Sequence, residues 1–150
     1  MSRFIPGGAI CVKAPRVVEA IKMVVKKTKG LSLSTEYEQL PDGMVEFSAT
    51  HFSRGLSDLI NLLAVDGQLH FSINADDRWI EFSVPVSDDA SAASLAKAAR
   101  SFNYAGCVTG VRDGVFFVGM MVEPAPSLAL YNGTSRDLYM LIALGLDLKL

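Results

Sequence analysis

The most constraining feature of the sequence is an alternation between two hydrophobic periods. In residues 31–49 and 69–84, apolar and polar residues alternate in the manner of paired strands, and residues 107–122 form a third, more apolar hairpin pattern. Outside these segments, apolar residues recur every three to four positions, as on one face of an amphipathic helix. Two strand segments share an echo, Val45-Glu46-Phe47-Ser48 and Ile80-Glu81-Phe82-Ser83. Hairpins that alternate with helices favour a layered α+β fold.

Turn residues predict how the strands are connected. Residues 41–43 (Pro-Asp-Gly), 74–77 and 112–114 (Arg-Asp-Gly) are typical of hairpin turns. The strand that follows the last turn, residues 115–122, is apolar on both faces. We therefore expect it inside the sheet or covered on both sides.

Cap residues predict where the helices begin. A proline fits the first helical position, and serine or threonine satisfies free amides at a helix start. The predicted helix starts are Pro15, Ser53, Ser87 and, in a capping box, Thr134 with Asp137. We predict a single α+β domain over residues 1–150, with one antiparallel or mixed sheet of about six or seven strands and about three or four helices. The alternating residues 146–150 are expected to dock as a terminal strand.

The composition is apolar for a chain without a membrane span. Half of the residues are hydrophobic and 20% are charged, yet no run approaches the roughly 18 apolar residues of a membrane helix. The amino-terminal residues do not resemble a secretory signal, so we expect a cytoplasmic protein with no membrane partner. Surplus apolar surface on such a chain is typically buried against another subunit or a partner protein.

The charge is divided unevenly along the chain. Residues 1–30 contain seven basic residues and one acid, a net charge of +6, whereas the other 120 residues contain seven bases and fifteen acids, a net charge of −8. The predicted first helix concentrates its lysines on the side opposite the apolar stripe, at Lys22, Lys26, Lys27 and Lys29. We call these four residues the basic ridge. It fits an acidic protein surface, phosphates of a nucleic acid, or simple exposure to solvent.

The sequence contains no recognisable catalytic or metal-binding motif. Its two histidines and two cysteines lack ligand spacing, and neither a phosphate-binding loop nor a nucleophile elbow is present. We therefore expect no cofactor and no metal site, and free thiols at Cys11 and Cys107. If the sheet encloses a pocket, Glu46, Glu81 and His51 are the first candidates for its chemistry.

These observations favour a non-catalytic protein–protein interaction module, such as a small inhibitor, immunity or adaptor protein that forms a homodimer or larger assembly. The expected contact residues are the basic ridge and an apolar end region, Tyr131, Tyr139, Met140 and Leu148, because aromatic residues and methionine are enriched at interfaces. A second hypothesis is a nucleic-acid-binding protein that uses the basic ridge. A third is a ligand-binding protein or enzyme with a pocket near Glu46, Glu81 and His51.

Overall fold

The computed structural model is an α+β structure with two sheets. It describes residues 10–28, 30–37, 39–63, 69–76, 78–86, 89–103, 107–124, 130–131 and 133–145. Its elements are β1 (Ile10–Lys13), α1 (Ala14–Lys27), β2 (Leu31–Glu36), β3 (Met44–Phe47), α2 (Ala49–Leu63), β4 (Leu69–Asp76), β5 (Trp79–Pro85), α3 (Asp89–Phe102), β6 (Cys107–Arg112), β7 (Val115–Met121) and α4 (Ser135–Gly145). The predicted cap at Ser87 and the predicted strand over residues 146–150 lie outside the described residues.

The strands form a five-stranded mixed sheet and a separate two-stranded pair. The larger sheet has the order β2-β4-β5-β7-β6, and the pair consists of β1 and β3. The α+β class and the number of helices are confirmed, whereas the prediction of one sheet with about six or seven strands is wrong.

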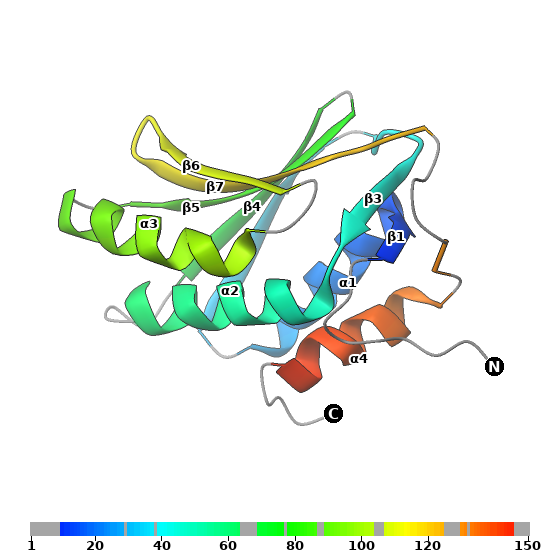
Figure 1. The fold of residues 1–150 in the computed structure, drawn as a ribbon, viewed down its shortest axis with the longest axis horizontal. Coiled ribbons are helices and arrows are strands. Elements are labelled where there is room, and N and C mark those ends of the chain that lie inside the picture. Colours follow the sequence, from blue (N-terminus) through cyan, green and yellow to red (C-terminus); the bar gives the residue numbers. More distant parts are fainter. Residues whose placement is uncertain are drawn as a thin grey trace.

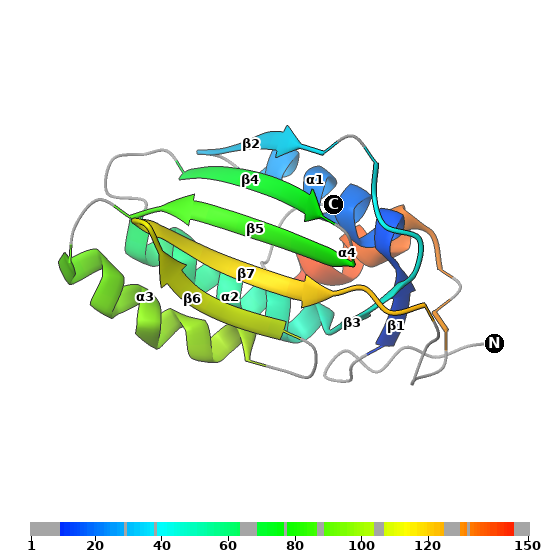
Figure 2. The same ribbon diagram turned by 90° about the horizontal axis from the view of Figure 1, so that it is seen from above.

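The helices lie on one side of the five-stranded sheet, which we call its inner face (Figure 1). Seen from above, the five strands lie in front of the helices, with α3 along β6 and α1 on the side of β2 (Figure 2). No described helix covers the opposite side, which we call the outer face. No helix in the described part of the chain combines the length and the apolar character needed to cross a membrane.

The first predicted hairpin does not form. Strand β2 instead pairs in parallel with β4, and β3 pairs antiparallel with β1. The connection over residues 37–43 is longer than the turns that close a tight hairpin. Its end is held elsewhere, because Met44 and Glu123 exchange backbone hydrogen bonds of 2.7 and 2.8 Å.

The other two predicted hairpins are confirmed, β4 with β5 and β6 with β7. The turn predicted over residues 74–77 is misplaced, because residues 74–76 still belong to β4 and pair with β5. The hairpin of β6 and β7 turns at Asp113 and Gly114, whose φ angles of 54° and 75° are those of a type I′ turn. As predicted for the strand that is apolar on both faces, β7 lies inside the sheet, between β5 and β6.

Helix α2 begins earlier than predicted. Ser48, not Ser53, caps it: the Ser48 hydroxyl oxygen accepts a 3.4 Å hydrogen bond from the backbone N–H of His51. His51 therefore lies in the first helical turn rather than at a strand end. Ser53 is buried inside the helix, where its hydroxyl lies 2.7 Å from the Ala49 carbonyl oxygen and 2.8 Å from that of Ile142 in α4.

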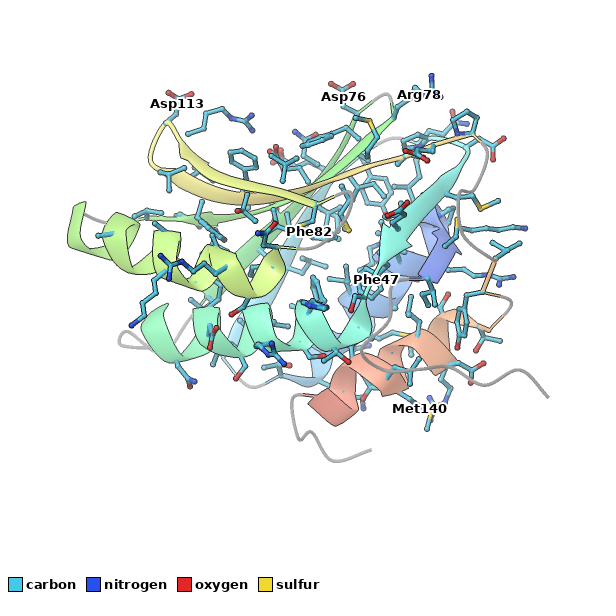
Figure 3. The ribbon with its side chains drawn as sticks, viewed as in Figure 1. Phe47, Asp76, Arg78, Phe82, Asp113 and Met140 are labelled. Carbon is cyan, nitrogen blue, oxygen red and sulfur yellow. The ribbon has the colours of Figure 1, made fainter. Side chains whose placement is uncertain are left out.

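The core fills the space between the inner face and the helices. Its centre is a series of phenylalanines from both sheets and two helices, of which Phe47 and Phe82 are labelled in Figure 3. The Phe52 ring lies 5.4 Å from Phe47, 6.1 Å from Phe82 and 5.9 Å from Phe102, in tilted or edge-on arrangements that aromatic pairs favour. Gly55 in α2 brings the helix backbone against the Phe102 ring, and α2 and α3 pack together there.

The capping box of α4 is confirmed. The backbone N–H of Asp137 donates to the Thr134 hydroxyl over 3.1 Å, and the Thr134 N–H donates to the Asp137 carboxylate over 3.0 Å. These reciprocal bonds satisfy two amides that the helix leaves free. The bond from the Thr134 backbone lowers the pKa of Asp137 below its usual value, because it stabilises the charged carboxylate.

Candidate functional site: the outer face of the sheet

The outer face is divided into a polar half and an apolar half. An antiparallel sheet with one solvated face normally presents polar side chains on that face. On β7 the outward residues are instead apolar, and β6 adds an outward valine. We define the apolar half as Val108, Val115, Phe117 and Met121, together with Trp79 on the neighbouring strand β5. Val108 and Met121 are each 50% exposed, so large apolar side chains meet solvent here.

The polar half lies over β2 and β4 and follows the usual rule. Its outward residues include serines that bond across the strands. The Ser32 hydroxyl lies 2.7 Å from the Nδ1 atom of His70, and the Ser72 hydroxyl bonds that of Ser83 on β5. These pairs satisfy the polar groups locally, so this half resembles an ordinary solvated sheet surface.

Two glycines allow aromatic rings to pack flat against the sheet in the apolar half. A Cβ atom at Gly119 would overlap the six-membered ring of Trp79, and a Cβ at Gly110 would lie 3.1 Å from the Phe117 ring. Each ring therefore occupies the space above a glycine on the adjacent strand, a close approach that another residue would prevent. The rings cover the sheet backbone and remain half-exposed on their outer sides.

An ion pair between a buried carboxylate and an exposed arginine lies between these rings. The Glu81 residue is 6% exposed, although no described helix covers its side of the sheet. One nitrogen of Arg112, Nη2, lies 2.8 Å from both Glu81 carboxylate oxygens, and the Trp79 ring N–H donates to the same carboxylate over 3.3 Å. The Arg112 guanidinium also stacks 4.6 Å from the centre of the Phe117 ring. These partners compensate the cost of removing a carboxylate from water.

This arrangement suits binding better than acid–base chemistry. Glu81 is engaged by Arg112 and Trp79, so its carboxylate already has hydrogen-bond partners within the sheet. The described residues contain no group of three or more His, Cys, Asp or Glu side chains that could hold a metal ion. What the site offers a partner is apolar area, two aromatic rings and an arginine whose side chain remains 59% exposed.

The basic ridge is less available than the sequence indicated. Lys22 forms a 3.4 Å ion pair with Glu19 and lies 5.1 Å from the centre of the Tyr37 ring. The hydrogen bond with Tyr37 is the main cause that raises the pKa of Lys22. Lys26 and Lys27 are exposed in the last turn of α1, where the helix dipole favours cations. Lys29 lies outside the described residues.

Most of the apolar end region belongs to the packing of α4 rather than to an open surface. Tyr139 is only 5% exposed and is part of the core. Tyr131 and Met140 are half-buried and pack against that core, and Leu148 lies outside the described residues. Helix α4 contacts both α1 and α2, so its buried face is wider than a single stripe. Met140 marks its outer side in Figure 3.

The candidate catalytic residues do not come together. Glu81 is on the outer face, whereas His51 begins α2 beneath the inner face and Glu46 lies on β3 of the small sheet. Cys11, opposite Glu46 in that sheet, is 2% exposed. Burial chiefly, and the nearby acidic side chains, raise the pKa of Cys11, so the thiol stays protonated at neutral pH.

The sequence interpretation missed Trp79, Arg112, Phe117 and Met121 as site residues. A signal was present: β7 is apolar on both faces, and Gly119 interrupts its outward series. That strand was expected inside the sheet or covered on both sides; it lies inside the sheet, and described helices cover only its inner face.

No known family model matches this chain, and no curated protein is significantly similar to it in sequence.

Proposed function

We propose that this protein is a non-catalytic interaction module whose apolar half binds another protein. An inhibitor or adaptor would act in this way, by covering a surface of its partner. The observation that carries the proposal is the break in the polar-outward rule over β6 and β7, where Val108 and Met121 are each half-exposed.

The composition of the apolar half supports binding. Tryptophan, phenylalanine, methionine and arginine are the residue types enriched at the centres of protein interfaces, and all four occur here within two neighbouring strand pairs. Completing the burial of Val108 and Met121 would contribute about 1 kcal/mol each, since full burial of such a side chain is worth roughly 1.5–3 kcal/mol. The two aromatic rings would add further binding energy. They already pack flat above the glycines, so ordering them on binding costs little entropy.

The charges of the site specify the partner further. The Arg112 guanidinium is oriented by its ion pair with Glu81 and by stacking on the Phe117 ring, yet the arginine side chain is 59% exposed. A partner with an apolar patch and a carboxylate at its centre would place that carboxylate against an arginine that is already oriented. We therefore propose an apolar partner surface that contains an acidic side chain.

Crosslinking in cells tests this proposal. A photoreactive phenylalanine analogue replaces Met121 in the full-length chain, and in a matched control it replaces Lys26, which is exposed on α1. We expect a covalent adduct with a partner protein from position 121 and none from position 26. The purified partner should then shift the fluorescence of Trp79, the one tryptophan in the chain, and Arg112→Ala should weaken that response. Equal adducts from both positions, or none from position 121, would overturn the proposal.

A further inference from the structure

We propose that two copies of this chain pair along the free edge of β6, with their α3 helices side by side. This surface is distinct from the apolar half, because it is the edge of the sheet and not its outer face. The proposal therefore does not depend on the function proposed above.

The first observation concerns the backbone of β6. In the described structure this strand ends the sheet and pairs with β7 alone. The two-residue turn at Asp113 and Gly114 makes Arg112 and Val115 a hydrogen-bonded pair, so alternation directs the N–H and C=O groups of Thr109 and Val111 away from β7. No backbone hydrogen bond from another described element reaches these outward groups.

The second observation is that this edge lacks the usual protection. Edge strands typically carry lysine, proline or a bulge that prevents pairing with another chain. The sequence of β6, Cys-Val-Thr-Gly-Val-Arg, contains no lysine or proline, and its ladder with β7 is uninterrupted. It also carries two of the large apolar residues that are most exposed, Val108 at 50% and Val111 at 46%, one on each face of the sheet.

The third observation is the helix that flanks this edge. Ser101 of α3 bonds Asp58 of α2, which fixes the side of α3 that faces α2. Ala96 and Ala99 lie about 140–160° around the helix from Ser101, on the side away from α2. Ala96 is exposed, Ala99 is half-buried against the core, and α3 runs along β6 in Figure 2. Small side chains there allow a second helix to approach closely.

One symmetry operation satisfies both elements. A twofold axis perpendicular to the sheet, beside Gly110, places β6 antiparallel to β6 of a second copy and α3 antiparallel to its counterpart. In this register the outward groups of Thr109 meet those of Val111 from the second copy. The two five-stranded sheets become continuous, and the two apolar halves become neighbours on one outer face. A second copy thus fits this edge because antiparallel pairing is self-complementary.

Sedimentation equilibrium of the full chain tests the proposal. We expect a monomer–dimer equilibrium, with a dissociation constant raised about tenfold or more by Thr109→Pro, which removes an outward N–H, and by Val111→Glu. Thr35→Glu and Ser34→Glu, at exposed positions on the opposite edge strand β2, are the controls and should leave the equilibrium unchanged. A chain that is monomeric at all concentrations, or a dimer that only the controls disrupt, would overturn the proposal.

Hydrogen exchange gives a second measurement that needs no variant. The amides of Thr109 and Val111 should exchange rapidly in dilute protein and become protected as the concentration rises. Protection that is independent of concentration would mean that another segment of the same chain covers the edge, and it would refute the dimer.

Discussion

Replacing Gly119 by alanine should move the Trp79 ring away from the sheet. Backbone strain does not oppose the change, because Gly119 lies in a regular strand and is not among the glycines with positive φ. Steric overlap does oppose it, because the new Cβ would coincide with part of the Trp79 ring. The strand backbone is held on both sides by β5 and β6, so the ring must give way.

The expected cost follows from what the ring loses. A tryptophan buries roughly 200 Å², and a half-buried ring that leaves the sheet exposes about 100 Å², worth about 2.5 kcal/mol. The ring N–H bond to Glu81, at 3.3 Å, adds about 0.5 kcal/mol or more. The alanine itself offsets about 0.4–1 kcal/mol of this loss, because it lowers the conformational entropy of the unfolded chain. We therefore expect the free energy of unfolding to fall by about 2 kcal/mol.

Urea denaturation and tryptophan fluorescence measure the two effects separately. Because Trp79 is the single tryptophan, its emission should shift to longer wavelength and become more accessible to acrylamide. Gly110→Ala is the matched control: its Cβ would lie 3.1 Å from the Phe117 ring, a contact that small movements relieve. It should cost less than about 1 kcal/mol and leave the emission unchanged. A Gly119→Ala protein with wild-type stability and emission would refute the placement of the ring.

Four further substitutions test the helix layer. Gly55→Ala should lower the free energy of unfolding measured in urea by about 1–2 kcal/mol. The new Cβ would lie 2.6 Å from the Phe102 ring, and this overpacking outweighs the gain in helix propensity. In a Phe102→Leu background the same change should be neutral or stabilising. Ser53→Ala should cost about 1 kcal/mol in thermal unfolding, since it removes the buried hydroxyl between α2 and α4. Thr134→Ala should cost about 1 kcal/mol. The pKa of Asp137 is lower in the folded protein than in the unfolded chain, so this carboxylate stabilises the fold at pH values above the ordinary aspartate pKa of about 3.9. That stabilisation is lost as the pH falls through the folded pKa. Asp137→Asn should therefore make the free energy of unfolding less dependent on pH in this acidic range.

Local sequence signals were sufficient to predict the helices and strands, but not which strands pair with each other. The Asp113-Gly114 turn and the Thr134–Asp137 capping box are encoded within four residues, and both occur as predicted. The first hairpin failed because its pairing depends on contacts distant in sequence. Strand β2 pairs with β4 across the whole of β3 and α2, and the start of β3 is held by Glu123. A pattern of alternation identifies a strand but does not name its neighbour.

The same distinction explains why the sequence pointed to α4 and not to the outer face of the sheet. The sequence indicated an apolar surplus, and it was assigned in part to Tyr139 and Met140 because they flank the stripe of one helix. Their burial depends on α4 packing against two helices, which periodicity along α4 cannot reveal. The excess lies instead on β7, whose two apolar faces the sequence did show. A helix covers the second face only if the chain has one left after covering the first. The four helices of the described residues all lie on the inner side of the sheet or beside the small one. An apolar face without a helix of its own is the physical reason to look for its cover outside the chain.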